Sequence, residues 1–432
     1  MIKKFLKKIP HLRFCFNKIK QILNKIKIIN EPIRIYLAHK KIKKVIELKK
    51  EKILNGSKIR VAFFITQKQL WNSQTVYDNL LSNDLFEPVI VTFPNCEDKV
   101  NSKKVTCEDN YNFFESKKMN VVLGYDINNN LFLNLNDINA DIIFYDQTTP
   151  NLPNNLLWDE AGKNSLVCYI PYGYKVAKFY EAHFNSKLTN NCWAIFAESD
   201  WHKKQFKKFG LAKGKNVVVS GYPKLDVYNI KNDNLDSDKN TKKIIIWAPH
   251  WSIKNSSIEY STFDKYYKFF IQYATNNKDI FWVFKPHQRL RYYLEEIGFM
   301  TKDKINDYYK QWDKLPNCQF YNDSDYFDLF KNSNALITDC GSFLAEYLPT
   351  KNPIMLLVSG NSAGYNEIGD KLVNTYYKAF NENDVKKFIN NVVIKNNDFL
   401  KEKRLKNLDL VQPNPGGAGK FIVNHIRKIL IK

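Results

Sequence analysis

The feature that most constrains the fold of this chain is a set of three short apolar runs, each followed at once by polar residues. The runs cover residues 243–248 (K-I-I-I-W-A), 279–284 (D-I-F-W-V-F) and 335–337 (A-L-I). Short runs rich in β-branched and aromatic side chains are typical of strands that are buried on both faces of a parallel sheet. The three runs therefore predict an α/β domain in the C-terminal half of the chain.

The polar residues after these runs form a candidate binding site. His250 follows the first run, Lys285 and His287 follow the second, and Asp339 follows the third. Ligands of doubly wound sheets bind beyond the carboxyl ends of the strands, where these residues would gather. Together they predict a positively charged rim suited to a phosphorylated ligand.

The third run leads into a turn and a predicted helix start that suits an anion. Gly341 would let the backbone approach a ligand closely, and Ser342 would add a hydroxyl donor at the helix N-terminus. The alternative is an ordinary strand–helix turn, because serine is also a common helix-capping residue.

Around these residues the chain resembles a known family. The segments A-P-H-W (248–251), F-K-P-H (284–287) and I-T-D-C-G-S-F-L-A-E-Y (337–347) are similar to motifs of the CDP-glycerol glycerophosphotransferase family, which builds teichoic acids and related capsule polymers. The resemblance runs from about residue 59 to the C-terminus. It implies a GT-B-like α/β fold, in which two doubly wound Rossmann-like domains face each other and the C-terminal domain holds a CDP-linked donor.

The resemblance also implies roles for individual residues. Those that fall on the donor-binding and phosphate-binding motifs of the family are Lys285, His287, Asp339, Gly341, Ser342 and Glu346. Glu346 would suit a ribose hydroxyl, because its carboxylate would repel a phosphate. Gly341 departs from the family pattern, which has a serine at this position.

The general base is where the chain departs most from the family. The family carries a histidine in a W-H-G loop, whereas the matching segment here is P-Y-G-Y-K (171–175), with Tyr172 at the histidine position. A phenol with an ordinary pKa near ~10 is a weak base at neutral pH. The catalytic candidates are Asp146, Tyr172, His183, His250 and His287. Asp146 ranks first as the base because it ends a predicted N-terminal strand, whereas His250 and His287 would act as donors near the phosphates.

The predicted reaction is the transfer of a polyol phosphate, with glycerol phosphate as the first choice, from a CDP-activated donor to an acceptor hydroxyl. The acceptor would be a cell-surface polymer or a lipid-linked molecule, and CMP would be released. Two alternatives remain open at this point: a GT-B glycosyltransferase that uses a nucleotide sugar, and a catalytically silent nucleotide-binding homologue.

The first 54 residues carry most of the chain's excess charge. They hold 17 Lys or Arg residues against three Glu residues, a surplus of 14 within a net charge of +22. Apolar residues recur there at helical spacing: Ile2, Phe5, Leu6, Ile9, Leu12, Phe16, Ile19, Leu23 and Ile26. A basic amphipathic helix predicts binding to an anionic membrane surface. The alternatives are a helix docked on the protein body and nucleic-acid binding, of which we expect the latter to be absent.

The remaining sequence predicts two α/β domains after this segment. We expect a basic helical segment at 1–54, an acceptor-binding domain at 55–240 and a donor-binding domain with a terminal helix at 241–432, with a core that folds without residues 1–54. The polar stretch 229–242 has the composition of a linker.

Motifs for metal or cofactor binding are absent from the sequence. There is no H-E-x-x-H motif, no Walker A loop and no C-x-x-C pair among the seven cysteines. We therefore expect no metal, no cofactor and no disulfide framework, in a reducing compartment. No apolar run approaches the ~18 residues that a membrane-spanning helix needs. We expect a cytoplasmic protein bound at the inner face of the membrane.

Overall fold

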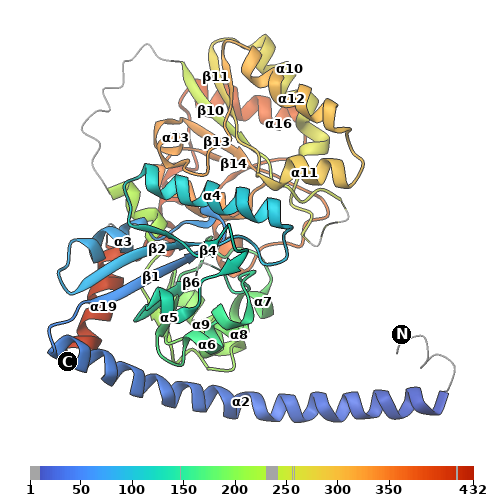
Figure 1. The fold of residues 1–432 in the computed structure, drawn as a ribbon. Helices are drawn as coiled ribbons and strands as arrows, with labels where there is room; N and C mark the ends of the chain where they lie inside the picture. The colour runs from blue at the N-terminus through green and yellow to red at the C-terminus, as the bar shows by residue number, and fades with distance from the viewer. Residues whose placement is uncertain (1–9, 146, 230–241, 255, 257, 415–416) are drawn as a thin grey trace.

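The computed structural model describes residues 10–145, 147–229, 242–254, 256, 258–414 and 417–432, without the side chains of residues 10–30, Asn101 and Asn229. Two α/β domains lie one above the other, and a long helix, α2 (Pro10–Leu54), runs along the base of the N-terminal domain (Figure 1). Asp146, the first-ranked base, and the apolar residues of the predicted N-terminal stripe lie outside this description.

The N-terminal domain is built on a seven-stranded parallel sheet in the order β3-β2-β1-β6-β7-β8-β9. Its strands are β1 (Ile59–Ile65), β2 (Phe86–Thr92), β3 (Val121–Leu123), β6 (Ile142–Tyr145), β7 (Leu166–Tyr169), β8 (Ala194–Ala197) and β9 (Val217–Val219). Its main helices are α3 (Gln74–Leu81), α4 (Val100–Ser116), α7 (Tyr180–Phe184), α8 (Lys187–Asn191) and α9 (Asp200–Phe209). The short strands β4 (Tyr125–Asp126) and β5 (Leu131–Phe132) form an antiparallel pair.

The C-terminal domain is built on a six-stranded parallel sheet in the order β12-β11-β10-β13-β14-β15. Its strands are β10 (Lys243–Ala248), β11 (Ile280–Phe284), β12 (Cys318–Phe320), β13 (Ala335–Thr338), β14 (Ile354–Leu357) and β15 (Tyr377–Ala379). Its main helices are α10 (Phe263–Asn276), α11 (Arg289–Glu296), α12 (Lys302–Lys314), α13 (Phe327–Asn332), α14 (Gly341–Glu346) and α15 (Glu367–Val373). The three apolar runs are thus β10, β11 and β13, which are neighbours in one sheet.

The apolar character of the strands follows from their burial on both faces. In β1 every residue except Arg60 is buried, because helices cover the sheet on each side. Aromatic rings fill the space between sheet and helices: Phe63 stacks on Phe144 with centroids 4.9 Å apart, and Trp247 stacks on Phe270 at 4.3 Å. The predicted fold class, two doubly wound Rossmann-like domains, is confirmed.

The terminal helix α19 (Ala418–Ile431) belongs to the N-terminal domain, which corrects the predicted placement in the C-terminal domain. Its buried residues Ile422 and Ile426 share a core with Val76 and Leu80 of α3. Gly419 is required at this crossing, because a Cβ there would lie 2.4 Å from Oγ1 of Thr75. The chain therefore returns to its first domain after completing the second.

A segment of the N-terminal domain reaches into the C-terminal domain and joins the two. We call residues 171–180 the bridging segment. Its residue Ala177 pairs with Tyr365 in an antiparallel bridge, and the N–H of Asn366 donates to the carbonyl of Val176 at 2.8 Å. Val176 is itself buried in the core of the C-terminal domain. Because this contact is made by buried backbone groups, it fixes how the two domains face each other.

The described side chains of α2 dock on the N-terminal domain rather than leaving it. Val45 is 3% exposed and lies in the domain core, and Lys49 and Lys52 pair with Asp141 at 3.0 and 2.5 Å. Asp141 also accepts the N–H of Arg60 at 2.8 Å, which ties the helix to the start of β1. These contacts argue against the prediction that the core folds unaided after removal of residues 1–54, because residues 31–54 contribute to that core. Among the described helices, none combines the length and the apolar character needed to cross a membrane.

Two deletions test this division of α2. Removal of residues 1–54 exposes the site of Val45, and each fully buried aliphatic side chain contributes about 1.5–3 kcal/mol to stability. We expect that variant to melt at a clearly lower temperature or to aggregate. Removal of residues 1–30 keeps the docked part of α2 and is expected to lower the melting temperature less than removal of residues 1–54. Differential scanning calorimetry measures both, and equal melting of the two variants would contradict the docking of residues 31–54.

Candidate active site

A cavity of about 460 Å³ lies between the two domains, and we call it the central cavity. Its N-terminal wall is the bridging segment and α7, and its C-terminal wall consists of the segments that follow β10, β11 and β13. The predicted site residues that line it are Tyr172, His183, His250, His287, Gly341 and Ser342. The domain interface thus brings six predicted residues to one place, although they are up to 170 positions apart in sequence.

Three other predicted residues, Lys285, Asp339 and Glu346, are buried behind the cavity wall. They do not line the central cavity, so their positions do not favour direct contact with a ligand there. Each instead contacts groups that shape the wall.

Asp339 holds the C-terminal wall together. One carboxylate oxygen accepts the N–H of His250 at 2.5 Å, and the other accepts the N–H and the hydroxyl of Thr262 at 2.6 and 2.7 Å. Burial raises the pKa of Asp339 to about 7, although these donors oppose the shift. Asp339 is therefore a positioning residue that fixes His250 at the end of β10.

The two histidines on the C-terminal wall face the cavity as hydrogen-bond donors. Nδ1 of His250 accepts the N–H of Ser252 at 3.2 Å, and Nδ1 of His287 accepts the N–H of Arg289 at 3.2 Å. Because Nδ1 accepts in both rings, each neutral ring carries its proton on Nε2. The ring centroids lie 5.1 Å apart, close enough for both to contact one phosphate group.

Both imidazoles are kept neutral by their surroundings. Burial, followed by the neighbouring His287, holds the pKa of His250 well below its usual value. His287 is reached by solvent through the cleft, yet the protein around it and the nearby Lys285 and Arg289 lower its pKa as well. A bound anion would reverse these shifts, because it favours the charged form of every group nearby.

Lys285 supplies positive charge from behind the wall. Its Nζ donates to the carbonyl of Asp323 at 2.9 Å and lies 4.8 Å from the ring centroid of Tyr326. Burial and the neighbouring Lys224 lower the pKa of Lys285 to about 8. No ion pair joins Lys285 to a carboxylate among the described residues, so its charge is left to act on the cleft.

Glu346 is not open to a ribose, which differs from the expectation. It is 1% exposed, its Oε2 accepts the hydroxyl of Tyr326, and Nζ of Lys224 lies 4.0 Å away. Lys224 also donates to the hydroxyl of Tyr326 at 2.7 Å. These three side chains join the end of the first domain to the second, and a role for Glu346 in binding would require this network to open.

The bridging segment meets the N-terminus of α14 at close range. A Cβ on Gly173 would lie 3.8 Å from Cβ of Ser342, and one on Gly341 would lie 3.1 Å from Cγ2 of Val176. Gly341 therefore allows the two walls to approach, as well as any ligand. Since α14 is only six residues long, the hydroxyl of Ser342 is the more substantial donor at this point.

Behind the N-terminal wall lies a buried charged network that sequence reasoning missed. Nζ of Lys175 pairs with Oε1 of Glu198 at 3.0 Å, and Nε2 of His202 contacts the carbonyl of Lys175 at 3.2 Å. The other ring nitrogen of His202 contacts the hydroxyl of Ser199 at 2.8 Å. The only sequence signal was the polar pair Glu198-Ser199 after β8, which ordinary turn chemistry also explains.

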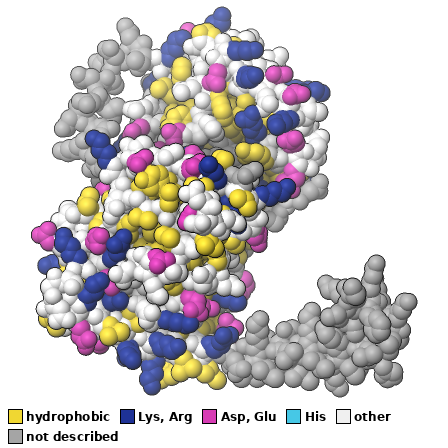
Figure 2. Space-filling model, in the orientation of Figure 1, with side chains coloured by type: hydrophobic (Ala, Val, Ile, Leu, Met, Phe, Trp, Pro, Cys, Tyr) yellow, Lys and Arg dark blue, Asp and Glu magenta, His cyan; other side chains and the backbone are white. Residues whose placement is uncertain are grey.

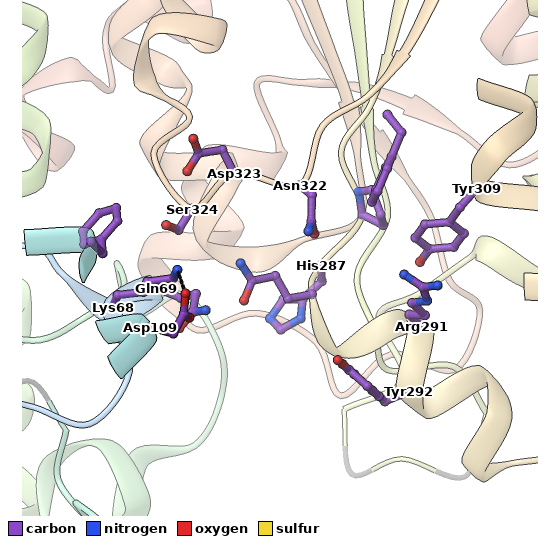
Figure 3. Close-up of a pocket in the computed structure, with 14 residues that line it drawn as sticks. Lys68, Gln69, Asp109, His287, Arg291, Tyr292, Tyr309, Asn322, Asp323 and Ser324 are labelled. Carbon is purple, nitrogen blue, oxygen red and sulfur yellow. Dashed lines mark hydrogen bonds and ion pairs between the residues drawn. The ribbon is translucent and has the colours of Figure 1, made fainter. Parts of the chain in front are cut away.

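A second cavity of about 490 Å³ adjoins the first, and we call it the side cavity. Figure 3 shows Lys68, Gln69 and Asp109 of the N-terminal domain on one side and residues of the C-terminal domain on the other, with His287 between them. The C-terminal domain contributes most of its lining, including Arg291 and the segment 322–324. His287 lines both cavities, so this histidine lies at the junction between them.

The arrangement suits the binding of a phosphorylated molecule across the junction. Hydrogen-bond donors, buried positive charge and a neutral polar wall stabilise negative charge that develops on a leaving phosphate. Within the described part of the chain, no group of three or more His, Cys, Asp or Glu side chains could hold a metal ion.

Comparison with known proteins supports the resemblance to the family. A sequence model of the family described as CDP-Glycerol:Poly(glycerophosphate) glycerophosphotransferase matches residues 177–382. The match includes both donor-side histidines but begins after Tyr172, at the point where the chain departs from the family's histidine motif. No curated protein matches the chain in a sequence comparison.

Solved structures show the same fold at low sequence identity. The wall teichoic acid polymerase TagF superposes with a TM-score of 0.56 at 15% identity, over 92% of this chain and 97% of that chain. The UDP-GlcNAc 2-epimerase from Neisseria meningitidis, bound to UDP-GlcNAc, superposes with a TM-score of 0.54 at 14% identity, over 86% of this chain and 100% of that chain.

The fold and the family match together define a GT-B-like transferase. Residues 177–382 match the CDP-glycerol glycerophosphotransferase family, as the motifs at β10, β11 and β13 predicted.

The lowered pKa of Lys285 predicts a pH dependence of nucleotide binding. A lysine with a pKa of about 8 is mostly charged at pH 7 and mostly neutral at pH 9, and an anion binds the charged form better. We expect the affinity for CDP to fall roughly 10-fold from pH 7 to pH 9, as measured by isothermal titration calorimetry.

The control for this experiment is a lysine outside the buried wall. Lys285→Met should weaken binding at pH 7 and flatten the pH dependence, whereas Lys254→Met, at a solvent-exposed side chain, should change neither. An affinity that is constant over this range in the unmodified protein would exclude a role for the charge of Lys285.

Proposed function

We propose that this protein transfers glycerol phosphate from CDP-glycerol to a hydroxyl of a cell-surface polymer or lipid-linked acceptor, and releases CMP. The observation that carries the proposal is the junction at His287, where donors from three strand ends surround one cleft between the domains. Support comes from the family match and from a TagF structure obtained with CDPG.

In this proposal the donor and the acceptor occupy different cavities. The side cavity is lined mainly by the C-terminal domain and would hold the cytidine, with Arg291 and the polar segment 322–324 around it. The central cavity is lined mainly by the N-terminal domain and would hold the acceptor hydroxyl. The diphosphate would then lie at the junction, within reach of His250, His287 and Ser342.

The C-terminal wall would stabilise the leaving group. As the bond between the glycerol-bearing phosphorus and the bridging oxygen breaks, negative charge grows on CMP. The Nε2–H groups of His250 and His287 and the hydroxyl of Ser342 would donate to these oxygens, and Lys285 would stabilise their charge from behind. Positioning by Asp339 would hold His250 in place without contact with the ligand.

The base of the N-terminal domain would bind the membrane. Near the docked part of α2, Lys40, Lys43, Lys213 and Lys215 surround a hollow of about 600 Å³, whose lining also includes the exposed Tyr36. Figure 2 shows basic and hydrophobic side chains together at this lower end of the molecule. Positive charge next to exposed apolar side chains is the combination that binds an anionic lipid surface. We place the enzyme at the inner face of the membrane on this basis.

Release of CMP tests the proposed reaction directly. The protein is incubated with CDP-glycerol and a soluble acceptor that ends in glycerol 3-phosphate, and CMP is measured by chromatography. We expect His287→Ala and Ser342→Ala each to lower turnover by about 10²–10³-fold, because each removes one donor to the transition state. Lys254→Met, at a solvent-exposed side chain, serves as the control and should retain turnover.

Two results would redirect the proposal. If UDP-sugars raised the melting temperature while CDP-glycerol did not, the glycosyltransferase alternative would take its place. If CDP bound but neither water nor the acceptor ever released CMP, the chain would be a nucleotide-binding homologue without activity.

Sedimentation with vesicles tests the membrane surface. We expect the protein to bind vesicles that contain phosphatidylglycerol at low salt and to leave them at high salt. Replacing Lys40, Lys43, Lys213 and Lys215 by Gln should weaken binding roughly 100-fold or more, since each lysine near the surface contributes about 1 kcal/mol.

The matched control changes four exposed lysines of the C-terminal domain, namely Lys302, Lys304, Lys310 and Lys314 of α12. Both variants carry the same net charge. If both lost vesicle binding equally, the attraction would come from overall charge rather than from the hollow beside α2.

A further inference from the structure

The proposed transfer needs a group that takes the proton of the acceptor hydroxyl, and the following inference rests on that proposed reaction. The family's histidine position is occupied by Tyr172, whose side chain is 50% exposed. A base must reach the central cavity from the N-terminal side, because the donors occupy the opposite wall.

The contacts of the described histidines leave one imidazole on the N-terminal wall. The six described histidines are His39, His183, His202, His250, His287 and His425. His39 contacts Asn190 beneath the domain and His425 packs on Phe421 in α19, so neither reaches the cleft. Both ring nitrogens of His202 contact protein groups, and the ring is fully buried.

Two of the remaining three, His250 and His287, line the cavity from the donor side, and Nδ1 of each accepts a backbone N–H, which leaves Nε2 to donate. A ring that presents N–H toward the leaving phosphate cannot at the same time take a proton from the acceptor. This leaves His183, which lines the central cavity from α7, on the opposite domain.

The position of His183 is fixed by packing rather than by hydrogen bonds. Its ring lies edge-on to Phe179 and Phe184, with centroids 5.9 Å away in each case. One turn earlier, the hydroxyl of Tyr180 donates to Glu367 of the C-terminal domain at 2.9 Å, which anchors α7 across the cleft. Nδ1 of His183 is buried and makes no hydrogen bond with any described residue. Within the described part of the chain, no protein group therefore fixes Nδ1 of this ring as donor or acceptor.

The charges around His183 keep the ring neutral before substrate binds. Burial is the main cause that lowers the pKa of His183 to about 4, and the nearby Lys175 is the second. His202 also lowers this pKa, whereas Glu198 raises it. A neutral imidazole has the lone pair that a base requires. The negative charge of a bound diphosphate would raise this pKa toward neutrality, where proton transfer is most effective.

We propose that His183 is the general base of the reaction and replaces the histidine that the chain lacks at Tyr172. As the acceptor oxygen forms its bond to the glycerol-bearing phosphorus, His183 takes the hydroxyl proton. The bond from that phosphorus to the bridging oxygen breaks, and CMP leaves with the electron pair. The imidazolium then returns its proton to solvent, so the products are a phosphodiester, CMP and one proton.

The test compares His183→Asn with His425→Asn in the CMP-release assay, using CDP-glycerol and the glycerol 3-phosphate acceptor. We expect His183→Asn to lower turnover by about 10²–10⁴-fold, to lose the acidic limb of the pH–rate profile and to bind CDP as before. His425 is also a partly exposed histidine but packs in α19, so its replacement should leave rate and profile unchanged.

Rescue by a free base separates chemistry from folding. His183→Ala should regain activity when imidazole is added, in proportion to the neutral fraction of the imidazole. Tyr172→Phe should keep the acidic limb of the profile, because the phenol is not the base.

Two outcomes would overturn the inference while leaving the reaction intact. One is a His183→Asn variant that keeps the acidic limb and the rate of the unmodified protein. The other is loss of that limb in Tyr172→Phe, with no rescue of His183→Ala by imidazole. Failure of the unmodified protein to release CMP would instead reject the proposed reaction itself, so the two failures are distinguishable.

Discussion

The arrangement of the site depends on the docking of the bridging segment into the C-terminal domain. Backbone hydrogen bonds between Val176 and Asn366, and the burial of Val176 and Tyr174 in the second core, hold the N-terminal wall against the C-terminal one. The return of α19 to the first domain adds a second connection. Without these contacts, residues on separate sheets would have no fixed distance from one another, and no common cavity would form.

The electrostatics of the cleft follow from which charges reach it. The carboxylates of Asp339, Glu346 and Glu198 are all buried and contact protein donors behind the walls. The polar side chains that line the central cavity include imidazoles, hydroxyls and Lys175, which pairs with Glu198, and Lys285 lies close behind the C-terminal wall. No described carboxylate lines the central cavity, which favours a diphosphate there, whereas Asp109 and Asp323 line the side cavity.

Much of the fold could be predicted because parallel strands are marked by uninterrupted apolar runs. The runs at 243–248, 279–284 and 335–337 became β10, β11 and β13. The elements that connect domains were harder to predict. The amphipathic pattern of α19 would allow its apolar face to pack on either domain, so the pattern does not predict which one it joins. The sequence of the docked half of α2 resembles that of a free basic helix, because its partner Asp141 is distant in sequence.

The sequence by itself determined the fold class, the resemblance to the family and the strand ends at which His250, His287 and Ser342 lie, because these depend on local patterns of two to eleven residues. Only the tertiary structure decided which residues reach the cavity and which lie behind it. Asp339 and Ser342 are three positions apart, yet the turn between them directs one carboxylate into the wall and leaves one hydroxyl at the cavity. The position of His183 is also decided by tertiary structure, because the docked bridging segment places α7 opposite the donor histidines. Burial and distance arise from packing between segments far apart in the chain, and no local pattern encodes them.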